Sequence, residues 1–205
     1  MPLTHRAASP AAPVSLSVRL AQSGILAAAA GVFARKGAAA TRVEDLLEAA
    51  GVARRTFYKY FGSKEAVLCA LYELATTELL RAVQGAGDAS DPLPTIRAGI
   101  DLYLDYHAEN AALLKVIIEY SIRSDSPLAP LRRRFREQLV EILENAARAG
   151  SRHRHDRFTY VALISALEGL SLVLLEDGGK PAEIARAKAA MHDLVERVLG
   201  AAAHR

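Results

Sequence analysis

The sequence predicts an all-α protein with about nine helices. Alanine is abundant, tryptophan is absent and runs of β-branched residues are scarce, so helix is favoured over strand along most of the chain. The 205 residues are 51% hydrophobic and 24% charged. This composition can bury a substantial core and is typical of folded soluble proteins rather than disordered ones.

The chain is expected to begin with a flexible arm at residues 1–14, which carries three prolines among small residues. Arg6 in this arm is a candidate for a contact in a DNA minor groove, but a tail without a role explains it equally well. The first helix is predicted over about residues 16–36, where apolar residues recur at helical spacing. Gly37 is expected to end this helix in a left-handed turn.

Two short helices joined by a tight turn are predicted next. The first is expected to start at a capping box, in which Thr41 and Glu44 satisfy each other's exposed amides, and to end at Gly51. The second helix is too short to be stable alone. Phe57 and Phe61, four residues apart, give it an apolar stripe that packing can hold. This arrangement is the build of a helix-turn-helix.

The rest of the chain is predicted to be helical as well. A long helix is expected to start at Lys64 and to reach about Gln84, and a loop rich in glycine and proline follows it. Two further helices are expected to start at prolines, where the missing amide costs least. The later helices are predicted over about residues 95–107, 110–123, 127–149, 156–176 and 181–199.

Charge is divided unevenly along the chain. The overall net charge is +3, but residues 1–64 hold nine Lys and Arg against three acidic residues, a net charge of +6. The remaining residues carry a net charge of −3. A basic first third on a mildly acidic remainder is expected of a DNA-contacting unit joined to a second unit. We therefore predict a DNA-binding domain at residues 15–62 and a second helical domain at residues 63–205.

Several classes of protein are excluded by what the sequence lacks. The single Cys69 rules out an intramolecular disulfide and a cysteine-based metal site. The longest apolar stretch, at residues 161–175, is broken by polar residues, and no signal peptide is evident, so we expect a cytoplasmic protein without a membrane span. A helical enzyme would need a phosphate loop, a metal triad or a nucleophile motif, and none appears, so no catalytic residue, cofactor or metal is predicted.

A pattern of residues over some 50 positions around the helix-turn-helix has the spacing of a known family. Its parts are Ile25-Leu26, Ala28-Ala29, Phe33, Gly37, Thr41, the run 48–52, the run 56–61, and Ser63-Lys64-Glu65. In these residues the first 70 positions resemble the DNA-binding domain of the TetR/AcrR family of bacterial transcriptional regulators. One position departs from the pattern, because Ala53 stands where a serine or a similar capping residue is usual.

The resemblance implies that the second short helix and its neighbours contact a double-stranded DNA operator. Arginines at the start of that helix suit guanine edges or phosphates, and tyrosine hydroxyls suit phosphate oxygens. A lysine at a helix N-terminus adds its charge to the helix dipole at a phosphate. The residues expected to contact DNA are Thr41, Arg42, Arg54, Arg55, Thr56, Tyr58, Lys59, Tyr60 and Lys64.

An effector site is implied among the middle helices. Tyr103, Tyr106 and His107 lie at i, i+3 and i+4 and therefore share one helical face. In the resembled family a pocket for a small molecule lies among the helices at these positions. The residues expected to line it are Tyr72, Tyr103, Tyr106, His107, Glu119, Tyr120 and Arg123. For each residue taken singly, an ordinary place in the core or on the surface is the competing interpretation, and the class of the ligand cannot be read from them.

The last two helices are expected to form a homodimer surface. One carries a narrow strip of small residues, which allows close approach of helices, and the other carries a continuous apolar stripe. The two helices from each of two subunits would make a four-helix bundle. Part of this surface could instead be buried in the core of a single chain. The residues are Ala162, Ala166, Gly169 and Val173 in one helix and Ile184, Ala187, Met191, Leu194 and Val198 in the other.

Two clusters are interpreted as ordinary surface. The run Arg132-Arg133-Arg134 with Arg136 is expected to form a solvated face rather than an anion site. His153 and His155 beside Asp156 are expected to lie in a loop rather than to hold a metal. The sequence thus favours a homodimeric repressor released by an unidentified small-molecule effector. The alternatives are an architectural DNA-binding protein or an activator without an effector pocket, and a helical enzyme.

Overall fold

The structure, a computed structural model, describes residues 16–86, 91–150, 155–176 and 178–200. Within these ranges it contains nine α-helices, a terminal π-helical turn and no strand, so the predicted all-α fold class is confirmed. The arm with Arg6 and the residue His153 lie outside the described ranges. The elements are α1 Leu16–Ala40, α2 Val43–Ala50, α3 Arg54–Tyr60, α4 Lys64–Gln84, α5 Pro92–Glu109, α6 Ala111–Ile122, α7 Ala129–Gly150, α8 Arg157–Glu176, α9 Pro181–Val195 and the turn Glu196–Gly200.

Most helices begin and end where local signals placed them. Gly51 ends α2 with a left-handed backbone (φ 62°, ψ 32°), and the Ser63 hydroxyl caps α4 by accepting from the Ala66 amide at 3.2 Å. Pro181 occupies the first turn of α9 as predicted. Pro127 does not start α7, which begins two residues later, because the Ser126 hydroxyl first accepts from the Leu128 amide and holds a turn there.

The junction of α1 and α2 differs from the prediction. The positive φ of Gly37 (74°) kinks the chain as expected, but helical geometry resumes and reaches Ala40. The Thr41 hydroxyl donates to the Gly37 carbonyl at 2.7 Å, which the kink leaves without a helical partner. The predicted capping box of Thr41 and Glu44 is therefore wrong. The cap lies one residue later, where the Asp45 carboxylate accepts from the Arg42 amide at 2.8 Å.

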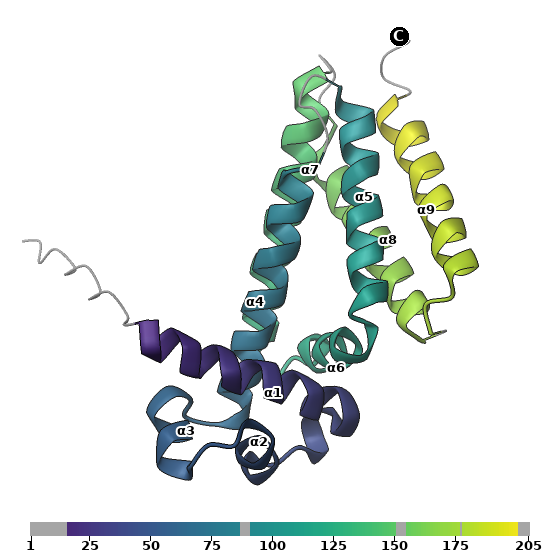
Figure 1. Ribbon diagram of the computed structural model, residues 1–205. Coiled ribbons are helices and arrows are strands. Elements are labelled where there is room, and N and C mark those ends of the chain that lie inside the picture. Colours follow the sequence, from purple (N-terminus) through teal and green to yellow (C-terminus); the bar gives the residue numbers. More distant parts are fainter. Residues whose placement is uncertain (1–15, 87–90, 151–154, 177, 201–205) are drawn as a thin grey trace, which may run out of the picture.

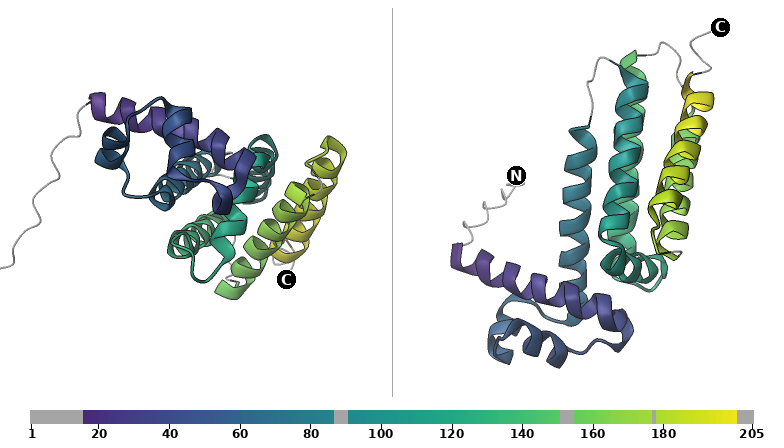
Figure 2. Two further views of the ribbon diagram at one scale, coloured as in Figure 1. Left: turned by 90° about the horizontal axis from the view of Figure 1, so that it is seen from below. Right: turned by 45° about the vertical axis from the view of Figure 1, so that its right-hand side comes forward.

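The helices are arranged as a small unit at one end of a larger bundle. Helices α1, α2 and α3 pack together at the lower end of the molecule in Figure 1, and α4 runs from this unit along the bundle. Helix α5 lies between α4 on one side and α9 on the other (Figure 2). Helix α6 packs along α1 and so connects the bundle to the small unit a second time. The buried side chains form a nearly continuous core from Phe33 and Leu46 to Tyr160 and Met191.

Three pairs of charged residues, spaced one helical turn apart, join α5 to α9. In each pair a nitrogen of the basic side chain lies within 2.9 Å of a carboxylate oxygen, and each pair retains partial exposure to solvent. Partly exposed pairs of this kind add little to stability singly. As a row they align the two antiparallel helices along their whole contact. The pairs are Arg97 with Glu196, Asp101 with His192, and Asp105 with Lys188.

Helix α8 is the one helix of the described residues that is both long and strongly apolar. By length and composition alone it is able to cross a membrane, which the polar interruptions in its sequence had led us not to expect. Its inward face buries Tyr160, Leu163 and Leu167 against α5, α7 and α9. Length and hydropathy do not distinguish a membrane span from a core helix, and this inward packing is that of a core helix.

The turn at Gly51 generates a stability prediction with a matched control. Gly51→Ala forces a Cβ into the left-handed region and should lower the free energy of unfolding by about 1–2 kcal/mol. Gly24→Ala changes an exposed glycine inside α1 whose added Cβ would meet no atom within 4 Å, and it should raise stability by about 0.5–1 kcal/mol. Urea denaturation of both variants measures the difference. Equal effects of the same sign would contradict this account of the turn.

Candidate nucleic-acid interface and ligand cavity

Helix α3 is held in place by its two phenylalanines. Phe57 is fully buried and Phe61 is 6% exposed, as their spacing predicted, and their rings lie 6.0 Å apart. No side chain caps the helix, because its N-cap is Ala53. Seven residues without a cap are too few for a stable isolated helix. The packing of Phe57 and Phe61 against α1, α2 and α4 therefore fixes the orientation of α3.

The outer face of α3 is rich in cations and aromatic rings. Arg55 and Lys59 are exposed, and Tyr58 is 47% exposed. The ammonium group of Lys59 lies 5.4 Å from the centre of the Tyr60 ring. Arg54 is exposed as well, but its guanidinium donates to the carboxylate of Glu44 in α2. The hydrogen bond to Arg54 helps to hold the pKa of Glu44 below its usual value.

Lys64 is engaged inside the protein rather than presented to solvent. Its ammonium donates to the carbonyls of Ala38 (2.9 Å), Ala39 (3.2 Å) and Thr41 (2.7 Å). A lysine has three donors, so all three are used at the C-terminal end of α1. Thr41 is 1% exposed and its hydroxyl is bonded to Gly37. In this structure the Thr41 side chain is buried and the partly buried Lys64 ammonium is bonded to α1, so DNA contacts by these two residues stay predictions.

The other seven residues expected at the interface keep at least part of their surface. Arginines, a lysine, hydroxyls and aromatic rings on one short helix offer donors for phosphate oxygens and base edges. Of the three acidic residues of α2, Glu44 is paired with Arg54, Asp45 is paired with Lys36, and Glu48 is exposed. The seven residues are Arg42, Arg54, Arg55, Thr56, Tyr58, Lys59 and Tyr60.

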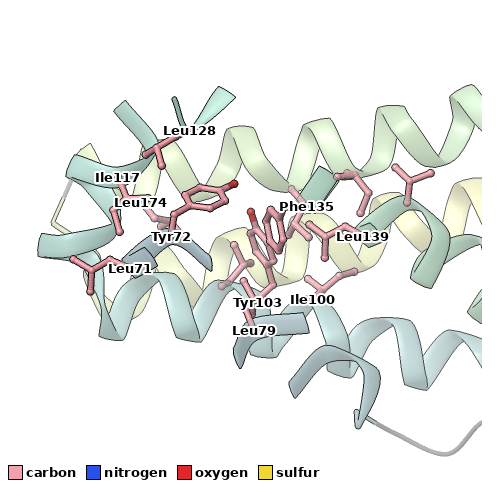
Figure 3. Close-up of a cluster of buried hydrophobic side chains, with 14 of the residues drawn as sticks. Leu71, Tyr72, Leu79, Ile100, Tyr103, Ile117, Leu128, Phe135, Leu139 and Leu174 are labelled. Carbon is pink, nitrogen blue, oxygen red and sulfur yellow. The ribbon is translucent and has the colours of Figure 1, made fainter. Parts of the chain in front are cut away.

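A cavity of about 50 Å³ lies between α4, α5, α6, α7 and α8. Four of the predicted effector residues line it, namely Tyr72, Tyr103, Tyr106 and His107. The hydroxyls of Tyr72 and Tyr103 point toward one another across the interior in Figure 3. Burial raises the pKa of each of these two tyrosines well above its usual value. The pKa of Tyr106 is also raised by burial, to about 12, so all three phenols stay neutral.

Three predicted effector residues are not at this cavity. Glu119 and Arg123 are exposed, and the Arg123 guanidinium pairs with Asp125 at 2.9 Å and lies over the Tyr120 ring. Helix α6 instead turns Leu114, Ile117, Ile118 and Ser121 toward the cavity. Apolar residues occur on several faces of α6, so the sequence did not define its rotation. Glu119, Tyr120 and Arg123 therefore do not line this cavity, and their role at an effector site stays a prediction.

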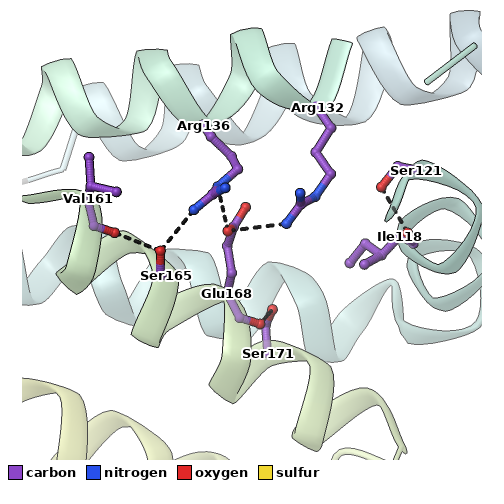
Figure 4. A network of polar contacts seen from close by, with 8 residues as sticks. All are labelled: Ile118, Ser121, Arg132, Arg136, Val161, Ser165, Glu168 and Ser171. Carbon is purple, nitrogen blue, oxygen red and sulfur yellow. Dashed lines mark hydrogen bonds and ion pairs between the residues drawn. The ribbon is translucent and has the colours of Figure 1, made fainter. Parts of the chain in front are cut away.

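The sequence analysis missed a charged cluster in the cavity wall. Glu168 of α8 lies 2.7 Å from the Arg136 guanidinium and 3.4 Å from that of Arg132, both in α7 (Figure 4). Burial raises the pKa of Glu168, and the two arginines oppose this shift. Ser165 accepts from Arg136 at 2.9 Å, so the cluster is well bonded. The expected solvated face holds only for Arg133 and Arg134, which are exposed.

Two sequence signals could have located this cluster. Arg132 and Arg136 are four residues apart and therefore share a face of α7. Glu168 is the only acidic residue between Arg157 and Leu175 in the long, strongly apolar helix α8. A carboxylate in such a helix requires a buried partner, and a pair of arginines on a neighbouring helix supplies one.

His107 is a neutral acceptor in the cavity wall. Its Nδ1 lies 2.7 Å from the Tyr103 carbonyl, which only accepts, so Nδ1 carries the proton and Nε2 is left as an acceptor. The imidazole stacks on the Tyr103 ring with centroids 4.2 Å apart. Burial lowers the pKa of His107 to about 4, with the bond to Tyr103 opposing this shift.

The residues expected at a dimer surface divide between two faces. In α8, Ala162 and Gly169 are exposed and Val173 is 52% exposed, while Ala166 is partly buried. In α9, Ala187 and Met191 are 7% and 2% exposed and belong to the chain's own core. Ile184 and Val198 pack against that core, and Leu194 is 37% exposed. The apolar stripe of the last helix therefore faces inward and packs against α5 and α8. Of its five residues, Leu194 is the exposed one.

The remaining reactive side chains form no further site in the described part of the chain. Cys69 is half-buried, and burial raises the pKa of its thiol, which disfavours the reactive thiolate. The His155 ring lies edge-on to Tyr160 at 6.2 Å. No group of three His, Cys, Asp or Glu side chains suited to a metal ion occurs among the described residues.

The fold and the two sites define a helix-turn-helix protein with a cavity in an attached helical bundle. The model of "Bacterial regulatory proteins, tetR family" matches residues 25–71. The chain is 36% identical over 96 residues to the transcriptional regulator EthR of Mycolicibacterium smegmatis, and this alignment covers 44% of this chain and 43% of EthR. The chain thus spans less than half of the length of this relative. The N-terminal part of the chain is thus similar to the DNA-binding unit of TetR-family transcriptional regulators.

Solved structures of TetR-family regulators share the whole fold. One from Pectobacterium atrosepticum superimposes with a TM-score of 0.70 at 22% identity, over 90% of this chain and 97% of that chain. PfmR of Thermus thermophilus gives a TM-score of 0.65 at 28% identity, over 84% of this chain and 94% of that chain. The relatives and solved structures named here are described as transcriptional regulators.

The buried imidazole generates a prediction about pH. The folded chain binds the proton of His107 near pH 4 and the unfolded chain near 6.5. Its contribution to stability is therefore complete above about pH 6.5 and is lost as the pH falls toward 4, to a total of about 3 kcal/mol. Denaturant unfolding at several pH values should show this loss. The variant His107→Gln should flatten the profile between pH 6.5 and 4.5, and an unchanged profile would mean that His107 is not the group responsible.

Proposed function

We propose that this chain acts in the cytoplasm as a homodimeric repressor that binds a palindromic DNA operator and releases it when a small molecule occupies the cavity. The observation that carries the proposal is the position of two helices. Helices α4 and α6 both line the cavity, and both also pack against the helix-turn-helix unit. A change of shape at the cavity is therefore able to move the helix-turn-helix unit, and with it α3, through either of these two helices.

DNA binding is supported by the exposed face of α3. Arg55 and Lys59 carry charge that no described acidic group neutralises, and they suit phosphates or guanine edges in a major groove. Arg54 is expected to exchange its carboxylate partner Glu44 for a phosphate when DNA binds. Tyr58 is exposed enough to bring its hydroxyl to the sugar-phosphate backbone.

Release by a ligand requires that the ligand bind one arrangement of the helices better than another. Tyr72 and Thr76 of α4 lie at the cavity, and the same helix begins at Lys64, which is bonded to the end of α1. On α6, Leu114 and Ile117 face the cavity while the helix packs along α1. A ligand that separates α4 from α6 should tilt the helix-turn-helix unit and change the spacing of the two α3 helices in a dimer.

Dimerisation is supported by the outward strip of α8. Ala162, Gly169 and Val173 follow one another along an exposed helical face, and a Cβ added at Gly169 would meet no atom within 4 Å. At one end of this strip Phe158 is 79% exposed. Small residues flanked by exposed apolar ones suit close packing of a second copy. Leu194 is the residue of the predicted α9 stripe that extends this face.

Selection of binding sites from random double-stranded DNA tests the proposal. The recovered sequences should be inverted repeats, because a two-fold dimer presents two α3 helices about 34–36 Å apart, one turn of DNA. An architectural DNA-binding protein would recover no defined sequence. Single half-sites without a repeat would contradict the dimeric repressor.

The variant Val173→Glu provides the control for dimerisation. It places a charge on the exposed strip of α8, away from the core and from α3. It should shift the chain to a monomer in analytical ultracentrifugation and weaken binding to the inverted repeat by about tenfold or more. Its melting temperature should change little. A dimer that persists in this variant would place the interface elsewhere.

The bonding of Lys64 generates a separate prediction about salt. Arg55→Met removes a direct phosphate or base contact and should reduce the slope of log affinity against log salt by about 1. Lys64→Met removes the three bonds to α1 instead, so it should lower DNA affinity and melting temperature with an unchanged slope. Titration of a selected operator at several salt concentrations measures both. A reduced slope for Lys64→Met would mean that the lysine leaves α1 and contacts a phosphate.

A further inference from the structure

A second cavity adjoins the first, and the two share one residue. The second cavity has a volume of about 60 Å³ and lies between α5, α7, α8 and α9. Among the described residues, Tyr103 alone lines both. Figure 3 places its ring between Tyr72 on one side and Ile100 and Leu139 on the other. Binding sites for small molecules commonly enclose about 300–1,000 Å³, so neither cavity accommodates such a ligand while Tyr103 keeps this position.

The two cavities differ in chemistry. The first is bordered by the guanidinium of Arg132, the carboxylate of Glu168, the imidazole of His107 and several hydroxyls. The second is bordered by aliphatic side chains, with the hydroxyl of Thr95 as the one polar side chain besides that of Tyr103. A ligand that occupies both must therefore have a polar end and a hydrocarbon end.

We propose that the two cavities are the halves of one site for an anionic amphiphile, with the head at Arg132 and the hydrocarbon chain beyond Tyr103, which swings aside as a gate. The proposal deepens the proposed function by naming the class of effector. It rests on that function only for the consequence of binding, and binding itself is measured without DNA.

The sign of the head follows from the charges in the wall. Glu168 lies closer to Arg136 (2.7 Å) than to Arg132 (3.4 Å), and Arg136 does not border the cavity. Two guanidiniums against one carboxylate leave one positive charge, and Arg132 is the cation that faces the cavity. His107 adds none, because its imidazole is neutral. A carboxylate or similar anion is the head that a guanidinium binds most strongly.

The gate follows from the contacts of Tyr103. Its ring is 3% exposed and stacks on His107, and its hydroxyl lies beside Ser171. The stack and the surrounding packing hold the ring between the cavities when no ligand is present. Displacing the ring exchanges the stack for contacts of a hydrocarbon chain with Ile100, Leu139 and their neighbours. Each methylene that reaches the second cavity should therefore raise affinity.

Calorimetric titration of the full chain, without DNA, tests the head and the chain separately. Decanoate, decanol and decyltrimethylammonium are used below their micelle concentrations. Decanoate should bind about tenfold more tightly than decanol, and the cationic probe should not bind measurably. From hexanoate to decanoate, affinity should rise by about fourfold per methylene. Equal binding of the three heads, or no dependence on chain length, would overturn the proposal.

Variants separate the two halves of the site. Arg132→Met should remove the preference for decanoate over decanol and leave decanol binding intact. Ala146→Leu fills part of the second cavity, so the gain per methylene should stop at a shorter chain. Ala82→Leu, at an exposed position of α4 that borders neither cavity, is the matched control and should bind as the unaltered chain does. An Ala146→Leu series identical to the control series would exclude the second cavity.

The gate has its own test. Tyr103→Phe keeps the partition but removes the hydroxyl that lies beside Ser171, so the ring should move aside more easily and decanoate should bind slightly more tightly. Tyr103→Ala joins the cavities permanently, and the advantage of decanoate over hexanoate should grow. Thermal unfolding confirms that each variant is folded. If Tyr103→Ala does not fold, the result for Tyr103→Phe decides, and weaker binding there would overturn the gate.

The outcomes distinguish this inference from the proposed function. Decanoate that binds as described but leaves operator affinity unchanged supports the site and contradicts release by an effector. A different small molecule that releases the operator, in a chain that binds no decanoate, supports the proposed function and overturns the amphiphile site.

Discussion

The ammonium group of Lys64 joins the two parts of this molecule. It is the first residue of α4, and it donates to three carbonyls at the end of α1. Helices α2 and α3 have eight and seven residues, too few to be stable without support. They depend on α1, on the two buried phenylalanines and on the direction in which α4 leaves the unit. Together with the packing of α4 and α6 on α1, this cation fixes the angle between the helix-turn-helix unit and the bundle.

The polar side chains inside the bundle pair with one another or with backbone carbonyls. Glu168 is buried among apolar neighbours, and such a charge is stable only with close partners. Arg136 and Arg132 provide them, and the serine hydroxyls on α8 turn to backbone carbonyls of the same helix. The bundle thus places the charged cluster of Glu168, Arg132 and Arg136 beside a region lined almost entirely by aliphatic side chains. Well-packed cores avoid this juxtaposition unless it serves binding or specificity.

Local signals made much of the fold predictable. Gly51, Ser63 and Pro181 act within a few residues of themselves, and α4 begins and ends where they and the helical spacing placed it. The fate of Thr41 was not predictable, because its hydroxyl could accept from the Glu44 amide as a cap or donate to the Gly37 carbonyl, and the kink at Gly37 decided between them. Lys64 bonds to residues more than twenty positions away. The rotations of α6 and α9 depend on neighbours that no sequence window contains.

The row of charged pairs between α5 and α9 has a consequence for movement. A slip of α9 by one turn in one direction would bring Asp101 opposite Glu196, and a slip in the other would bring Arg97 opposite His192. Both displacements lose favourable pairs, and the first also places like charges together. Helices α5 and α9 are thus held in a fixed register and move together. Any expansion of the interior therefore displaces the helices on the other side of the bundle, α4 and α6, which pack against the helix-turn-helix unit.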